Sequence, residues 1–201
     1  VTILIFGLFI FGIGDSLLIV AELGNAPWSV LAQGVALRTP LSVGAATFLI
    51  SGIVLALWIP LRQKPGFGTL ANIAVISIFI QIGVDHIPEV TSNFPLQLLY
   101  VIVGIGLVGF GTAIYITCGL GPGPRDGLMT GLHYRTGLPI GRVRFVIEAA
   151  FLLAGWLLGG SVGLGTVLVT VLVGEVVAIF FGIVSRVSKP ADEATTDTEQ
   201  L

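Results

Sequence analysis

Charged residues and cysteines are scarce in this sequence. Only 10% of the 201 residues are Asp, Glu, Lys or Arg, whereas a soluble domain carries about 25%. This scarcity excludes an ordinary water-soluble domain, and no nucleic-acid partner is expected. The single cysteine, Cys118, excludes an internal disulfide, and we expect it to pack as a small apolar side chain. One cysteine and two histidines form no metal-binding cluster, so neither a metal nor a cofactor is expected.

Long hydrophobic runs, in contrast, are abundant. Hydrophobic residues make up 55% of the chain and the mean hydropathy is +1.04. A helix of about 20 apolar residues crosses the roughly 30 Å hydrocarbon core of a bilayer. The pattern therefore predicts an all-α polytopic membrane protein, with the lipid bilayer as its partner and about six transmembrane helices. These spans are expected near residues 2–22, 43–61, 69–88, 97–118, 139–158 and 166–186.

Two helical segments are too short to be spans. They read PWSVLAQGVALR at 27–38 and PRDGLMTGLHYR at 124–135, and each opens on proline, a favoured first residue of a helix. Twelve residues extend only about 18 Å at 1.5 Å per residue. We therefore predict two re-entrant half-helices, which enter the membrane and turn back.

The two halves of the chain repeat each other at one ungapped offset of 97 residues. LGNAPWS at 23–29 aligns with the start of LGPGPRDG at 120–127, and GFGT at 66–69 aligns with GLGT at 163–166. The boundaries follow as a first membrane repeat at 1–90 and a second at 91–188. Further aligned pairs are Gly7/Gly104, Gly14/Gly111, Leu31/Leu128, Gly34/Gly131, Arg38/Arg135 and Phe48/Phe145.

An odd number of crossings in each repeat predicts that the second repeat is inverted relative to the first. The distribution of basic residues agrees, because Arg135, Arg142 and Arg144 lie at the half-helix end of the second repeat. The basic segment RQK at 62–64 lies at the opposite end of the first repeat. The positive-inside rule then predicts that both termini are cytoplasmic. Eight full spans would place these three arginines outside. The acidic segment 189–201 is predicted to be a disordered cytoplasmic tail.

The half-helix starts are the candidate binding site. Helix N-termini present free N–H groups and a positive dipole end, which favour anionic groups, and transporter sites lie where such ends converge near the midplane. An alternative interpretation is that Asp126 only caps its helix and pairs with Arg125. The candidate substrate-binding residues are Asn25, Trp28, Ser29, Arg125, Asp126 and Thr130.

Acidic residues inside spans are expensive and therefore functional candidates. Asp15 and Glu175 are predicted to couple an ion or proton or to pair with Arg125. Alternatively, they are protonated carboxyls hydrogen-bonded between helices. Glu148 follows Arg144 by four residues, so the two are expected to pair along one helix face. Trp58 and Trp156 lie near span ends and are expected to be interfacial anchors.

Two motifs typical of enzymes lack their structural context. GIGLVG at 104–109 fits a dinucleotide-binding pattern but lies inside an apolar span. GGSVG at 159–163 fits a nucleophile elbow but has no sheet around it. No catalytic residue is assigned, and an enzyme is not expected.

The paired segments LGNAPWS and LGPGPRDG, each followed by a short helix and a G-x-G-T motif, resemble the YczE/YitT-like family of bacterial integral membrane proteins. The resemblance covers the chain except its tail, and its most specific residues are Gly121, Gly123, Pro124 and Asp126. In the first repeat Ala26 and Ser29 stand at the positions of Gly123 and Asp126, so any site would be asymmetric. The resemblance implies a multi-pass protein of the bacterial cytoplasmic (inner) membrane and implies no enzyme activity.

The leading hypothesis is a small membrane transporter or channel-like protein for a small anionic or zwitterionic solute, bound between the two half-helix starts. The alternative is a membrane-embedded ligand-binding subunit or scaffold of a larger complex that carries out no transport itself. A homo-oligomer or an accessory membrane partner is compatible with either hypothesis.

Overall fold

The computed structural model describes residues 1–187, and these residues form nine α-helices and no strand, which confirms the all-α fold. The predicted tail at 189–201 lies outside the described residues. The helices are α1 (Thr2–Val20), α2 (Pro27–Arg38), α3 (Val43–Ala56), α4 (Trp58–Leu61), α5 (Phe67–His86), α6 (Phe94–Thr117), α7 (Pro124–Thr136), α8 (Ile140–Leu157) and α9 (Leu164–Val187).

Five of the six predicted spans are long and apolar enough to cross a membrane. They are α1, α3 together with α4, α5, α6 and the Leu164–Val184 part of α9. The sixth, α8, has 18 residues but carries Arg142, Arg144 and Glu148, so its composition is less apolar. The short helices α2 and α7 begin at Pro27 and Pro124, as the sequence predicts.

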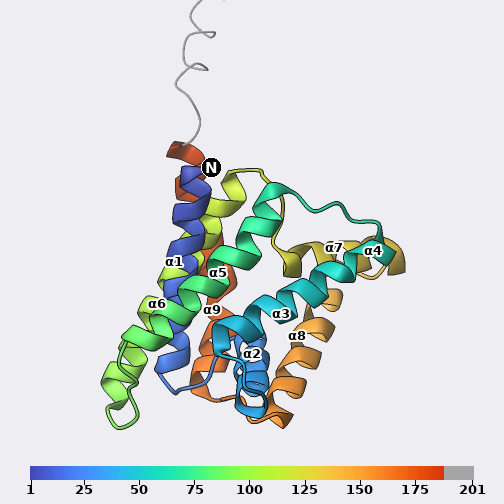
Figure 1. Cartoon of the computed structure of the whole chain (residues 1–201). Helices are drawn as coiled ribbons and strands as arrows, with labels where there is room; N and C mark the ends of the chain where they lie inside the picture. Colours follow the sequence, from blue (N-terminus) through green and yellow to red (C-terminus); the bar gives the residue numbers. More distant parts are fainter. Residues whose placement is uncertain (188–201) are drawn as a thin grey trace, which may run out of the picture.

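The most extensive helix contact joins α1 and α6, which run antiparallel on one side of the molecule (Figure 1). Gly7 lies against Gly111, and Gly14 lies against Gly104 at the other end of the same contact. A Cβ atom added to Gly14 would be only 2.8 Å from the backbone nitrogen of Val108, so a larger residue would push the helices apart. Small residues that allow such close approach are typical of membrane helix interfaces.

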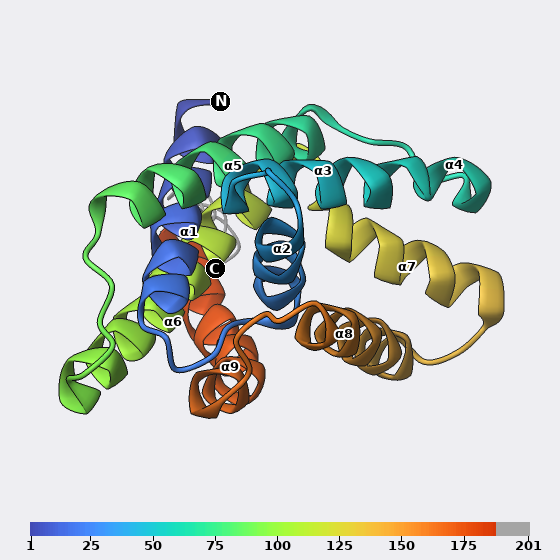
Figure 2. The same cartoon turned by 60° about the horizontal axis from the view of Figure 1, so that its bottom comes forward.

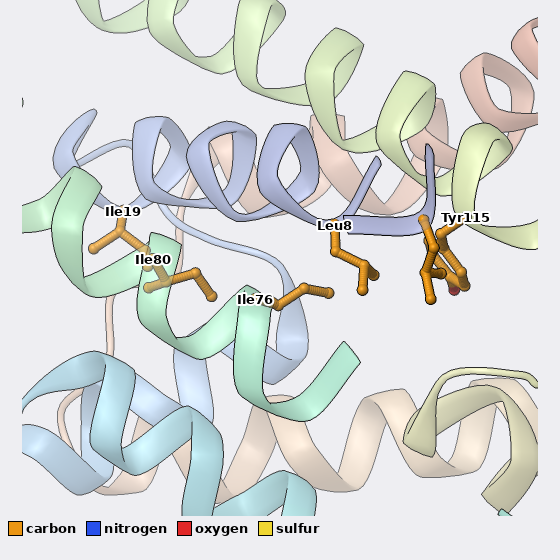
Figure 3. Close-up of a cluster of buried hydrophobic side chains, with 6 residues drawn as sticks. Leu8, Ile19, Ile76, Ile80 and Tyr115 are labelled. Carbon is orange, nitrogen blue, oxygen red and sulfur yellow. The ribbon is translucent and has the colours of Figure 1, made fainter. Parts of the chain in front are cut away.

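Two further helices flank this pair, one on each side. Side chains of α1 and α5 point toward one another in a buried cluster, with Tyr115 of α6 at its end (Figure 3). A second buried cluster joins α1, α6 and α9. The four long helices therefore form the frame on which the shorter helices are held. The first cluster comprises Leu4, Leu8, Ile19, Ile76, Ile80 and Tyr115, and the second comprises Leu18, Ala21, Val101, Ile105, Val108 and Val169.

The short helix α2 lies between α3 and α8 (Figure 2). Its contact with α8 is close because glycines meet there: a Cβ atom added to Gly155 would lie 2.5 Å from the backbone nitrogen of Leu31. The other short helix, α7, packs against α3, α4 and α8. Each short helix is thus held by residues from both halves of the chain.

Trp58 corrects one prediction from the sequence. It was expected to anchor the protein at the membrane interface, but its side chain is only 2% exposed. The indole Nε1 donates a hydrogen bond to the Pro124 carbonyl oxygen at 3.0 Å, and the ring lies directly against the Cα of Gly127. Trp58 therefore fixes the first turn of α7.

Special features of the backbone recur at the 97-residue offset found in the sequence. Glu22 and Gly119 both have positive φ, at 57° and 62°, and so do Gly24 and Gly121, at 98° and 120°. Two hydrogen bonds between the halves are also equivalent: the Gly165 N–H donates to the Leu23 carbonyl and the Gly68 N–H donates to the Leu120 carbonyl, each at 2.7 Å.

One pair of helices breaks this correspondence. α3 packs against α5, where the Gly44 N–H donates to Gln81 Oε1 at 2.9 Å. Their counterparts α8 and α9 barely touch. Gly44 lies against the Ser77 backbone, but Gly141 and Gly174, which stand at the positions equivalent to Gly44 and Ser77, would meet no neighbour within 4 Å if each carried a Cβ atom. A gap therefore separates α8 from α9.

Replacing Glu22 with glycine is expected to raise the free energy of unfolding by up to about 1 kcal/mol, because a left-handed conformation costs a non-glycine residue roughly 1–2 kcal/mol. Burial and the charge of Glu89 also raise the pKa of Glu22. Its carboxyl therefore contributes most to stability below the unfolded-state pKa, and this contribution is lost as pH rises through the folded-state pKa.

The gain from Glu22→Gly should accordingly be larger at pH 8 than at pH 4, measured as the thermal midpoint in detergent. Gly119→Ala is the matched control, since Gly119 has the same conformation and open space around it. This control should lose stability. A Glu22→Gly protein that melts below the wild type at both pH values would contradict the argument.

Candidate functional site

A cavity of about 280 Å³ lies where the two short helices begin. Residues 26–29 at the start of α2 and 123–126 at the start of α7 both line it. The long helices α1, α5, α6 and α9 contribute the remaining wall together with α3 and α8. Segments that are 97 residues apart in the sequence thus enclose one space, in which both signs of charge are present.

The backbone at these two starts has the same construction. Ala26 and Gly123 are the N-cap residues, both extended, and neither helix start has a side-chain cap. Proline follows as the first helical residue in each. First-turn N–H groups without a side-chain acceptor leave the positive end of the helix dipole available to the cavity.

Asp15 and Ser29 form the site on the side of α1 and α2. The Ser29 hydroxyl lies 2.9 and 2.8 Å from the two carboxylate oxygens of Asp15. Asp15 is 7% exposed and lines the cavity. Within residues 1–187, no Lys or Arg forms an ion pair with Asp15. Its only direct side-chain partner in that range is therefore neutral.

Arg125, Asp126 and Tyr115 form a second polar group in the lining. The Tyr115 hydroxyl donates to Asp126 Oδ2 at 2.9 Å, and Arg125 Nε lies 3.8 Å from Asp126 Oδ1. The side chains of Arg125 and Asp126 are 29% and 40% exposed, and both line the cavity. In the described part of the chain the Arg125 guanidinium makes no hydrogen bond, so its donors are free for a ligand.

Asp126 lies in the first turn of α7, as the alternative interpretation expects, but in the described residues its carboxylate accepts from the Tyr115 hydroxyl and from no backbone N–H of the helix. The predicted pairing with Arg125 is present, but it is loose. An arginine guanidinium keeps its positive charge in proteins, and the carboxylates of Asp126, Glu148 and Asp15 act on this one electrostatically.

A second ion pair and an aromatic pair complete the wall. Arg144 Nε donates to Glu148 Oε1 at 3.0 Å, which confirms the pairing predicted along α8. The Trp28 ring stacks on Phe151, with ring centroids 4.0 Å apart. Trp28, Arg144 and Glu148 all line the cavity.

Three of the predicted site residues do not line the cavity. Asn25 is fully buried, and its Nδ2 donates to Gln33 Oε1 at 3.0 Å, so it ties the start of α2 to its own helix. The Thr130 hydroxyl donates to the Asp126 carbonyl within α7. Glu175 is exposed on α9, although the neighbouring Gly174 does line the cavity.

Sequence reasoning missed Tyr115 and Asn72, which both line the cavity. Each is a polar side chain inside an otherwise apolar predicted span. Polar residues are rare in such spans, and this rarity could have identified both side chains. It could not show that they face the cavity, because the inward face of each helix is set by contacts with helices distant in sequence. Asp15 was found because an ionised group within a span is rarer still.

Replacing Ser29 with alanine is expected to lower the free energy of unfolding by about 1–3 kcal/mol, because it leaves a buried carboxyl without its donor. Asp15→Ala should lower it by a similar amount, because the buried Ser29 hydroxyl then loses its acceptor. The double variant should lose clearly less than the sum, since both single changes remove the same contact. Chemical unfolding in detergent measures all four proteins, and strictly additive losses would show that the two side chains do not interact.

Comparison with known proteins matches residues 1–182 to the model of a family of unknown function, DUF6198. The chain is 47% identical to an uncharacterised protein of Haemophilus influenzae, over 92% of this chain and 85% of that one. It is 32% identical to the uncharacterised membrane protein YczE of Bacillus subtilis, over 84% and 79% of the two chains, and 31% identical to YyaS of the same organism, over 90% and 91%. No solved structure matches.

Proposed function

We propose that this chain, which belongs to the DUF6198 family of YczE-like membrane proteins, is a small transporter for a small anionic or zwitterionic solute. The observation that carries the proposal is the charged cavity enclosed by the starts of α2 and α7. Short helices whose N-termini meet at a binding site are a recurring construction in secondary transporters. The proposal includes no enzyme activity.

An inverted repeat supports transport, and three observations support the inverted repeat. Equivalent helices α2 and α7, α3 and α8, and α5 and α9 begin 97 residues apart. The equivalent helices α1 and α6 run antiparallel. The contact of Gly7 with Gly111 maps, at the same offset, onto the contact of Gly104 with Gly14. Such reciprocity is expected when two units are related by a pseudo-two-fold axis in the membrane plane.

The proposed topology has six crossings, with α8 as the sixth, and treats α2 and α7 as re-entrant. The start of α1 and the end of α9 lie at the same end of the molecule (Figure 1), as an even number of crossings requires. Together with the positive-inside rule, it supports the proposal that both ends are cytoplasmic and that the protein lies in the inner membrane of a bacterial cell.

The difference between the repeats supports a carrier that alternates. α3 is packed on α5 whereas α8 stands away from α9. If the repeats exchanged these arrangements, α8 would close on α9 and α3 would leave α5, which would change the access to a fixed central site. Movement of one set of helices against another around such a site is how inverted-repeat carriers work.

One observation favours a second function, a ligand-binding subunit of a larger membrane complex. α9 is the least buried of the candidate spans, and Glu175 lies exposed halfway along it. An ionisable group facing lipid is costly, so a partner helix that covers this face would relieve that cost. In this second function the same cavity binds the ligand but transport requires the partner.

The test is flux into liposomes that contain only the purified protein. L-leucine, L-glutamate, acetate, phosphate and sulfate are supplied one at a time, and protein-free liposomes set the background. Uptake of at least one solute well above this background is the expected result. Binding of a solute without any uptake would contradict autonomous transport and favour the subunit.

Topology is tested separately by labelling single cysteines in a Cys118→Ala protein. Pro40→Cys and Gly137→Cys stand at equivalent positions just beyond α2 and α7. They are expected to react with an impermeant reagent from opposite sides of the membrane. Labelling of both from one side would rule out the inverted repeat.

A further inference from the structure

We infer that the cavity selects a small zwitterion with an apolar side chain, whose cationic end contacts Asp15 and whose anionic end contacts Arg125. This inference rests on the proposed function, because it takes the cavity as the solute site. Of the two proposed solute classes, anionic and zwitterionic, it selects the zwitterionic one. It also assigns the cationic group of the solute to Asp15 and the anionic group to Arg125.

The cationic pole is assigned to Asp15 from its contacts. Both carboxylate oxygens share a single hydroxyl donor, Ser29, and no protein cation within the described residues is paired with the carboxylate. Arg125 acts on this carboxylate electrostatically but forms no ion pair with it, and a buried carboxylate without a paired cation is unfavourable unless another group supplies the charge. An ammonium group of a solute supplies it and has spare N–H donors for both oxygens.

The anionic pole is assigned to Arg125. Its guanidinium has five donors, yet its nearest carboxylate oxygen, on Asp126, lies 3.8 Å from Nε. Asp126 is held by the Tyr115 hydroxyl at 2.9 Å, and so it is not drawn fully onto the arginine. A carboxylate from the solute can therefore bind the guanidinium in the bidentate manner that gives the strongest such contacts.

The charge of the whole cavity argues against a simple anion. Arg125 and Arg144 face three acidic groups, Asp15, Asp126 and Glu148, so a solute with only negative charge meets net repulsion. A solute with only positive charge leaves Arg125 without an acceptor. The rest of the wall is mainly apolar, which favours a hydrocarbon side chain on the zwitterion. The apolar residues include Phe11, Leu18, Ile50, Ile76, Val108 and Val173.

The test compares three molecules of one shape, bound to purified protein in detergent and followed by calorimetry. L-leucine carries both charges, 4-methylpentanoate lacks the ammonium group, and 3-methylbutylamine lacks the carboxylate. Leucine is expected to bind at least about tenfold more tightly than either, because one hydrogen bond to a charged group contributes about 1.5–3 kcal/mol.

Two substitutions assign the poles. Asp15→Asn should weaken the binding of leucine at least tenfold and leave the binding of 4-methylpentanoate unchanged or tighter. Arg125→Gln should weaken the binding of leucine but not that of 3-methylbutylamine. Glu89→Gln is the matched control, because Glu89 is exposed between α5 and α6 and does not line the cavity. If Asp15→Asn does not fold, Ser29→Ala removes the hydroxyl alone and should retain the preference for leucine over 4-methylpentanoate.

The outcomes separate this inference from the proposed function. Equal binding of 4-methylpentanoate and leucine overturns the inference. In that case, uptake of 4-methylpentanoate or of leucine into liposomes would still support the proposed transport. No binding of any of the three overturns the inference as well. Tight leucine binding without uptake supports the inference and contradicts autonomous transport.

Discussion

Replacing Arg125 with glutamine is expected to lower the uptake of L-leucine into liposomes by at least about 100-fold. A bidentate contact between guanidinium and carboxylate makes two charge-assisted hydrogen bonds, and each contributes about 1.5–3 kcal/mol. Loss of about 3 kcal/mol in binding corresponds to more than 100-fold at 25 °C. The fold should persist, since Arg125 makes no hydrogen bond within residues 1–187 and Tyr115 still holds Asp126.

Arg142→Gln is the matched control for this prediction. Arg142 is an exposed arginine on α8 that does not line the cavity, so the same change in charge should leave uptake near the wild-type rate. Helical content and elution volume of both variants establish that they fold. Equal uptake by the Arg125→Gln and Arg142→Gln proteins would remove Arg125 from the site.

Replacing Trp58 with alanine is expected to lower the free energy of unfolding by about 3–5 kcal/mol, the usual loss for a large buried aromatic side chain. Trp58 is 2% exposed, packs against Gly127 and donates to the Pro124 carbonyl. Removing the indole leaves a cavity and an unpaired carbonyl at the first turn of α7. Because this turn presents Arg125 and Asp126, binding should weaken together with stability.

Trp156→Ala provides the comparison, since Trp156 is 59% exposed on α8. Its loss of stability, measured by chemical unfolding in the same detergent, should stay below about 1 kcal/mol, as for other exposed positions. The loss of stability in Trp58→Phe should lie between these two values, because phenylalanine keeps most of the packing but lacks the N–H donor. Similar losses for Trp58→Ala and Trp156→Ala would contradict the role assigned to Trp58.

The helix boundaries were largely predictable from the sequence. In a bilayer every backbone polar group must be bonded internally, so runs of about 20 apolar residues become helices. Pro27 and Pro124 marked the starts of the two short helices because proline is favoured at the first helical position. The span prediction failed to separate α4 from α3, since the turn at Leu57 lies within one unbroken apolar run.

The directions of side chains were much less predictable. Trp58 and Trp156 both stand near span ends, and only the packing of α4 on α7 makes the first buried and leaves the second exposed. Asp126 has a residue type that favours helix capping, but its carboxylate accepts a hydrogen bond from the Tyr115 hydroxyl of α6. Such partners come from helices distant in sequence, so no local pattern records them.

The gap between α8 and α9 determines which forces act on any closing movement there. In water, joining two apolar helices is driven by removing hydrocarbon from solvent, but lipid tails are as apolar as leucine, and a bilayer cancels that drive. The closed pair α3 and α5 has a polar latch from Gly44 to Gln81, whereas Ala178 stands at the position equivalent to Gln81. A closed pair of α8 and α9 would therefore lack this hydrogen bond. In the proposed carrier, the charges of the bound solute would have to supply the free energy that favours closure.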